Sequence, residues 1–238
     1  MVSQITLGDI AVDVVLKDIK NVLLSVYPPT GRVRISAPQR MSIDTIRVFA
    51  ISKLEWIKQQ QTKLREQERE APRDYVERES HYVWGNRHLL RVSESDEPPS
   101  IQVKHGRMLL RVRPRTDEDK RRTLVEEWYR EQLKEAVPPL LARWQPLLDV
   151  RVERVFVQRM KTKCGSCNHR ARTIRFNTER AKKPVECLEY IVLHEMVHLL
   201  EPTHNARFTR LLDHIMPQWR HCRDTLKALP VRHERWSY

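Results

Sequence analysis

The fold of this chain is indicated by residues 194–204, which read HEMVHLLEPTH. Residues four apart lie on the same face of a helix, so His194 and His198 can present two imidazoles to one ion. Pro202 cannot continue the helix, because it lacks an N–H and clashes with the preceding turn. The chain must therefore turn at this point, and the turn can bring His204 back towards the same ion.

Three neutral imidazoles and one open position describe a catalytic zinc site, whereas a structural zinc is enclosed by four protein ligands. We therefore expect His194, His198 and His204 to bind one Zn2+ per chain. Glu195 follows the first histidine by about 100° of helix rotation. From there it can hold the attacking water and act as a general base without binding the metal. The pattern predicts a zinc-dependent hydrolase that cleaves peptide bonds in a protein or peptide substrate.

An ordinary amphipathic helix is the alternative for this segment, because apolar side chains recur along it at helical spacing. These are Val185, Leu188, Ile191, Val192 and Met196. They predict a helix that packs on a core whether or not it binds a metal. The apolar lead-in, the two histidines, the helix break and the third histidine together favour the metal site. Glu201 is a second candidate for the third ligand, although the proline after it gives His204 the better reach.

Downstream of the first histidine, the sequence resembles the YgjP-like metallopeptidase family. In that family the helix is followed by a histidine, a phenylalanine four residues later and a Met-Pro-x-Trp end, which here are His204, Phe208 and residues 216–219. Residues 158–167, QRMKTKCGSC, resemble the second block of the family. The family usually has tryptophan immediately before Gly-Ser-Cys, and this chain has Cys164 there.

The resemblance implies a zincin-like (minigluzincin) catalytic domain with a small sheet and the HExxH helix. It also implies that His194, His198 and His204 are the zinc ligands and that Glu195 is the general base. The site is similar, more distantly, to that of the SprT-like proteases, which act at DNA–protein crosslinks. The spacing of the histidines is also that of the metzincins, but their glycine between the second and third histidine is Glu201 here. No methionine turn of the metzincin kind can be identified.

The composition is that of a soluble and highly charged chain. Its 238 residues are 40% hydrophobic, 32% charged and 7% aromatic, which suffices for one large or two small domains. The sequence contains no run of about 18 apolar residues that could span a membrane. Residues 1–20 lack the apolar segment of a signal peptide. Four cysteines do not make a disulfide framework, so we expect a cytoplasmic protein. Composition does not predict the oligomeric state.

The net charge of +13, from 44 lysines and arginines against 31 acidic residues, favours a polyanionic partner such as nucleic acid. Solubility alone is the other explanation, because no basic run with interleaved aromatics and no known nucleic-acid module is present. The candidate contacts are Lys161, Lys163, Arg170, Arg172 and residues 113–122. The alternative function is therefore a basic nucleic-acid-binding protein in which zinc is structural or regulatory. Glu195 favours the peptidase, since a structural site needs no carboxylate there.

The order of elements predicts an α+β protein with a β-rich N-terminal domain over residues 1–115 and a catalytic domain over residues 116–238. Strands are expected at 10–16 and 21–26, at a return strand holding Val33 and Ile35, and at 89–92, 101–103 and 108–112, and residues 82–87 are expected to form a strand and a tight turn. One long helix is expected from Ile43 to about residue 70, with Ser42 as its N-cap. Further on, one helix is expected to end before Pro138, with a shorter one over residues 140–148. The sequence shows no internal repeat.

In the catalytic half, strands are expected over residues 150–157 and 172–177, with a basic loop over residues 161–170 between them. We expect the 172–177 strand or its neighbour to bind an extended substrate by edge addition. A helix over residues 206–215 is expected to be capped by Asn205. The candidates for oxyanion stabilisation are His169, Lys163 and Tyr190. The pair Cys164 and Cys167 is weak evidence for a metal site, because a structural zinc needs four ligands.

Overall fold

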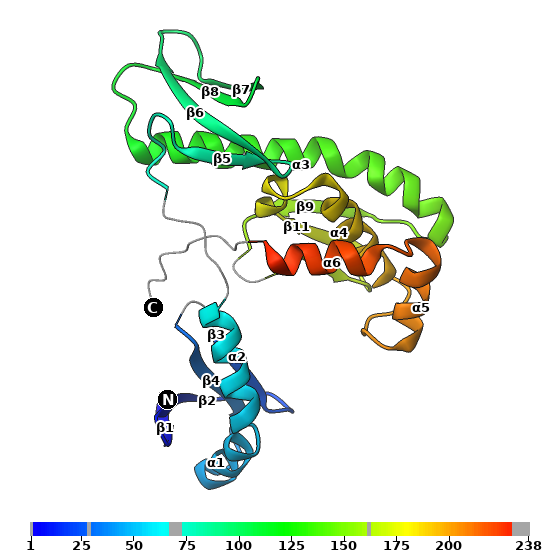
Figure 1. Cartoon of the computed structure of the whole chain (residues 1–238). Helices are drawn as coiled ribbons and strands as arrows, with labels where there is room; N and C mark the ends of the chain where they lie inside the picture. The colour runs from blue at the N-terminus through cyan, green and yellow to red at the C-terminus, as the bar shows by residue number, and fades with distance from the viewer. Residues whose placement is uncertain (1, 28–29, 67–72, 161–162, 230–238) are drawn as a thin grey trace. The chain divides into compact units, whose positions relative to one another are not determined.

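The chain has a mixed α+β fold with small sheets and helices distributed along its length (Figure 1). The computed structural model describes residues 2–27, 30–66, 73–160 and 163–229. The division between its two compact units falls after Pro72. Each unit has its own apolar core. Among the helices of the described residues, none is both long enough and apolar enough to cross a membrane.

The first unit is a four-stranded sheet with two helices on one face. Its strands are β1 (Val2–Leu7), β2 (Ile10–Lys17), β3 (Leu23–Tyr27) and β4 (Arg32–Pro38), in the order β1-β2-β4-β3. Alternate residues point to the same face of a strand, so the buried side chains form one apolar surface against the helices. These include Val12, Val14, Val33, Ile35, Ile46, Ala50 and Ile57. The predicted strands and their β3–β4 hairpin are confirmed, and β1 is an additional strand.

The single helix predicted after Ser42 is two helices, α1 (Ile43–Ser52) and α2 (Leu54–Glu66). Ser42 caps the first, as predicted, by accepting a hydrogen bond from the Thr45 N–H. The break lies at Lys53, whose N–H bonds to the carbonyl of Ala50. Because α1 packs on β1 and α2 on β3, the break lets one chain segment cover both edges of the sheet.

The second unit begins with a sheet of the same topology. Its strands are β5 (Ser80–Val83), β6 (Asn86–Glu94), β7 (Ser100–Lys104) and β8 (Arg107–Val112), in the order β5-β6-β8-β7. In both sheets the two central strands are parallel and each outer strand is antiparallel to its neighbour. The chain therefore contains a topological repeat that its sequence does not show, since many different apolar residues satisfy the same alternation.

The predicted break before Pro138 is wrong, because a single helix, α3, runs from Glu118 to Leu148 with three prolines inside it. Its buried residues follow one another every three or four positions along one face: Val125, Tyr129, Leu133, Val137, Leu141, Trp144 and Leu148. Pro138 and Pro139 lie on the exposed face. A proline inside a helix costs about 3 kcal/mol. Burial of each large apolar side chain stabilises by about 1.5–3 kcal/mol, so continuous packing favours the unbroken helix.

Residues 73–115, which the sequence placed with the N-terminal domain, share the core of the second unit instead. The inner face of the β5–β8 sheet includes Leu90, Met108 and Leu110, which belong to one apolar cluster with α3 and with helix α4 (Val185–Val197). No helix lies within residues 73–115, so this face is covered by α3. The Trp84 N–H also donates to the Ala181 carbonyl at 2.8 Å, just ahead of α4.

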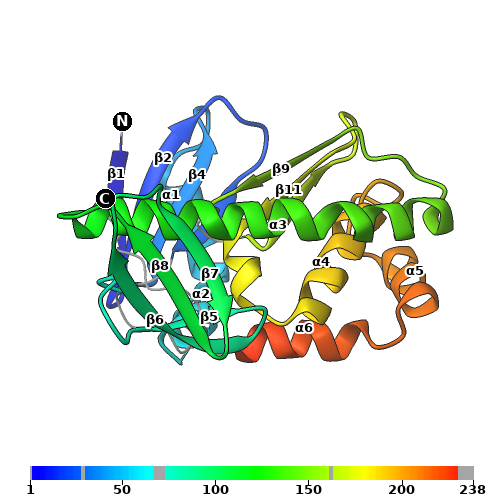
Figure 2. The same cartoon turned by 90° about the horizontal axis from the view of Figure 1, so that it is seen from above.

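The rest of the second unit has a three-stranded sheet of β9 (Arg154–Gln158), β10 (Gly165–Asn168) and β11 (Thr173–Asn177) in the order β10-β11-β9. The predicted basic loop thus contains a strand, β10. The short helix η1 (Thr178–Lys182) leads to α4 (Val185–Val197), followed by α5 (Ala206–Ile215) and α6 (Trp219–Ala228). Because α4 contacts β10, α3, α5 and α6, it is enclosed within this unit (Figure 2).

Candidate metal centre

His194 and His198 lie on one side of α4, a helix that is largely buried. The predicted apolar residues of α4 are buried, except Val185, which is 48% exposed. The helix ends at Val197, with His198 as its C-cap, and the N–H groups of residues 199–201 bond to the carbonyls of Met196 and Val197. The chain therefore leaves the helix before Pro202, through tightened turns that begin its return towards His194.

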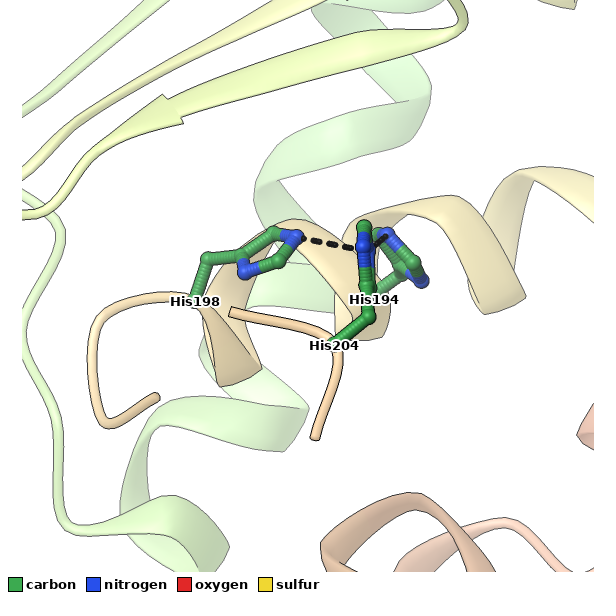
Figure 3. A group of neighbouring side chains, drawn as sticks. All are labelled: His194, His198 and His204. Carbon is green, nitrogen blue, oxygen red and sulfur yellow. Dashed lines mark hydrogen bonds between the residues drawn. The ribbon is translucent and has the colours of Figure 1, made fainter. Parts of the chain in front are cut away.

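The three predicted histidines come together at the end of α4 (Figure 3). The Nε2 atom of His204 lies 3.0 Å from Nε2 of His194 and 3.1 Å from Nε2 of His198. One nitrogen from each ring lies within 4.8 Å of the other two, and among the described residues this is the one such cluster of potential metal ligands. His204 is exposed and the other two are half-buried, so the site opens to solvent on the His204 side.

This arrangement fits a divalent metal ion. Zinc–nitrogen bonds of about 2.05 Å in tetrahedral geometry place two ligand nitrogens roughly 3.3 Å apart, close to the separations found here. Burial, together with the neighbouring His198 and His204, lowers the pKa of His194 to about 3. Burial also lowers the pKa of His198. Both rings are therefore neutral near pH 7, which is the form that binds a metal.

Two of the histidines have partners on their Nδ1 atoms, which sequence reasoning did not find. The Nδ1 of His198 lies 3.0 Å from the Glu201 carbonyl, and the Nδ1 of His194 lies 3.4 Å from the Tyr190 hydroxyl. A histidine that binds a metal through Nε2 carries its proton on Nδ1, so both contacts would fix the required tautomer and ring orientation. Tyr190 stands one helical turn before His194, a spacing that could have indicated it.

The carboxylate of Glu201, the second candidate for the third ligand, is directed elsewhere. Its Oε1 accepts a hydrogen bond from the Thr203 hydroxyl at 3.1 Å, and its Oε2 lies 4.0 Å from the Arg207 guanidinium. Only its backbone carbonyl serves the site, through His198. The geometry therefore favours His204 over Glu201.

Phe208 forms an apolar floor beneath the three histidines. Its ring centroid lies 4.9 Å from that of His194 and 4.7 Å from those of His198 and His204. The position of Phe208 follows from the cap of α5: Asn205 accepts a hydrogen bond from the Phe208 N–H at 3.0 Å. The predicted cap is confirmed, and it fixes the first turn of α5 directly after His204.

Glu195 is buried, with 6% of its surface exposed, and faces β10. A Cβ atom added to Gly165 would lie 2.7 Å from Oε1 of Glu195, so the carboxylate occupies the space that the missing side chain leaves. Burial raises the pKa of Glu195 to about 7, while the nearby Lys163 acts in the opposite direction. The carboxyl group can thus exchange a proton near neutral pH.

Asn177 holds the segment that leads into β10. Its side chain accepts from the Met160 N–H at 3.3 Å and donates to the carbonyls of Met160 and Lys163, both at 2.8 Å. Its backbone N–H donates to the Cys164 carbonyl at 3.0 Å. Gly165 follows Cys164 directly, so the buried Asn177 links the end of β11 to the strand that packs against Glu195.

Among the described residues, the two cysteines and His169 singled out from the sequence are not members of the histidine cluster. Cys164 is exposed and Cys167 half-buried, and burial together with the charge of Glu195 raises the pKa of Cys167 to about 11. That thiol is therefore protonated and a weak metal ligand. His169 is exposed in the turn between β10 and β11. Lys161 lies outside the described residues.

Comparison with known proteins places this site in context. The sequence model of the YgjP-like family, described as a metallopeptidase domain, matches residues 20–229. No curated protein matches the chain in sequence. Two solved structures of metallopeptidase zymogens are similar to part of it. Jannalysin of Methanocaldococcus jannaschii is 22% identical, and the match covers 40% of this chain and 92% of the jannalysin chain, with a TM-score of 0.33. Abylysin of Pyrococcus abyssi is 21% identical, and the match covers 41% of this chain and 99% of the abylysin chain, with a TM-score of 0.36.

Proposed function

The chain belongs to the YgjP-like metallopeptidase family, and we propose that it cleaves peptide bonds with zinc held by His194, His198 and His204 and with Glu195 as general base. The observation that carries this proposal is the convergence of three Nε2 atoms beside a buried carboxylate. Structural zinc sites are closed by four ligands, whereas this cluster has three and opens to solvent. The arrangement therefore supports a catalytic role for the metal.

Zinc, when bound, supplies Lewis acidity, which lowers the pKa of water and polarises a carbonyl oxygen. Glu195 takes the proton of the attacking water and delivers it to the leaving amine. Its confinement by Gly165 keeps the carboxylate from swinging away from the reacting atoms. Tyr190 and the Glu201 carbonyl hold two imidazoles in orientation, and Phe208 excludes water from beneath them.

The strand that presents the substrate is β10 rather than the 172–177 segment itself. β11 is paired on both sides, with β10 and with β9, so it has no free edge. β10 pairs with β11 alone among the described strands, and it contacts α4. An extended peptide added to its free edge would pass the Glu195 carboxylate, which lies against Gly165.

The test compares hydrolysis of a denatured protein by the wild type and by Glu195→Gln. We expect the variant to keep its zinc and melting temperature and to lose activity by about 10²–10⁴-fold, the contribution typical of general acid–base catalysis. Glu186→Gln is the matched control, because Glu186 lies exposed on the same helix. If Glu195→Gln hydrolyses the protein as fast as Glu186→Gln does, Glu195 is not the base. A purely structural zinc would then be the better explanation.

A further inference from the structure

The outer face of the β5–β8 sheet concentrates positive charge. Alternation along the strands directs most of the apolar residues to α3 and every lysine and arginine of these strands to the opposite face. The cations on that face are Arg87, Arg91, Lys104, Arg107 and Arg111. No carboxylate shares this face within the strands, and its exposed rings and apolar groups are Tyr82, 39% exposed, and Leu109, 38% exposed.

The cations differ in pairing from one end of the sheet to the other. Arg91 forms an ion pair with Glu77, and Arg111 forms one with Glu97. Arg87, Lys104 and Arg107 have no ion pair with any described residue. We call these three the unpaired cations.

Tyr82 belongs to the same end of the sheet as the unpaired cations. The strand register sets Tyr82 opposite Arg87, and Lys104 opposite Arg107. Neighbouring strands are about 4.8 Å apart and alternate residues about 6.6 Å apart along a strand. Arg87 is therefore the cross-strand neighbour of Tyr82, whereas Arg107 and Lys104 lie two and three strands further across the sheet, about 10 and 14 Å from the strand of Tyr82.

We propose that this face binds single-stranded nucleic acid, with Arg87, Lys104 and Arg107 on the phosphates and Tyr82 stacked on a base. Cations on three neighbouring strands can follow a phosphate backbone across the sheet, and the net charge of +13 attracts such a polyanion over a distance. Every base of a single strand can stack on an aromatic ring, whereas a paired base within a duplex is already stacked between its neighbours. An acidic peptide would use the cations but has no need of the ring.

This surface is a better candidate than the basic segment at residues 113–122. There, Arg122 is already paired with both Glu118 and Asp119. The unpaired cations also lie at the end of the sheet whose hairpin turn contacts the segment before α4, through Trp84 and Ala181. Nucleic acid bound here would therefore lie on the catalytic unit itself, on a face that contains none of the zinc-site residues.

The test measures binding of fluorescently labelled oligo(dT) and oligo(U) of equal length to the full chain as a function of salt. The variant is Arg87→Gln, Lys104→Gln, Arg107→Gln. Loss of three phosphate contacts should lower the slope of log affinity against log salt by about 2, and affinity at 0.15 M salt on the order of 50-fold. The DNA and RNA probes together show which sugar is preferred.

The matched control removes three cations from α3 with the same change in net charge: Arg130→Gln, Lys134→Gln, Arg143→Gln. Arg130 is half-buried and Lys134 and Arg143 are exposed, and the three are paired with Glu127, Glu131 and Glu189, respectively. The control should bind within about threefold of the wild type. Equal losses in the two triple variants would show that binding follows total charge, and would overturn the proposal. Peptide hydrolysis and melting temperature should be unchanged in both variants.

A second pair of variants tests the ring. Tyr82→Ala should weaken single-strand binding about tenfold or more, Tyr82→Phe should restore it, and neither should alter duplex binding. Equal effects on single strand and duplex would refute stacking. Polyglutamate that binds as tightly as the oligonucleotides, with the same sensitivity to the triple variant, would identify the face as a site for acidic polypeptide and overturn the assignment.

Discussion

Gly165→Ala should disable Glu195 without touching the metal site. The new Cβ would lie 2.7 Å from Oε1 and 2.9 Å from Cγ of Glu195, whereas ordinary contacts begin near 3.4 Å. The carboxylate must therefore move by several tenths of an ångström or more. A displacement of about 1 Å in a catalytic group costs on the order of 10²-fold in rate. Gly165 lies within β10 without a positive φ, so alanine strains no backbone angle and the effect is steric.

The assay is kcat for a denatured protein substrate, with zinc content and melting temperature measured on the same preparation. We expect kcat to fall about 10²-fold while zinc content is unchanged. Ser166→Ala is the control, because Ser166 lies on the same strand and alternation turns its side chain to the other face. The double variant Gly165→Ala, Glu195→Gln should be no slower than Glu195→Gln alone, since both changes act through one carboxylate. A kcat within about threefold of the wild type would refute the steric argument. Loss of zinc would instead assign Gly165 to the metal site.

Three further predictions concern the metal, the substrate strand and pH. His194→Ala, His198→Ala and His204→Ala should each lower zinc content measured by atomic absorption, and unchanged content in any one would remove that residue from the ligand set. Asn177→Ala should raise KM more than it lowers kcat, because it frees the segment before β10; an unchanged KM would argue against this role. Burial lowers the pKa of His81 below 6.5 in the folded chain. As the pH drops below 6.5, the unfolded chain is protonated at this histidine before the folded chain is, so the free energy of unfolding should fall. His81→Leu should show less of this decrease in acid denaturation curves, and an identical pH dependence would refute it.

The sequence by itself determined the parts of this protein that depend on neighbours along the chain. Two histidines four apart, a proline and a third histidine six residues later suffice to predict the cluster, because helix geometry puts the first two on one face and the proline forces the turn that can return the third. Hydrophobic patterning predicted the strands of the two four-stranded sheets except β1, and Ser42 and Asn205 marked the starts of α1 and α5. All these patterns are local, so no knowledge of distant contacts was needed.

Tertiary structure decided the features that depend on contacts between residues far apart in the sequence. Helix α3 continues through Pro138 because its buried face packs on the core of the second unit. Residues 73–115 belong to that unit because α3 covers the inner face of the β5–β8 sheet. The wall that Gly165 forms against Glu195 joins residues 30 positions apart and depends on how β10 packs on α4. The shared face of the unpaired cations likewise depends on the parallel pairing of β6 with β8. Sequence spacing carries no information on such contacts, because they are selected by the packing of complete surfaces against one another.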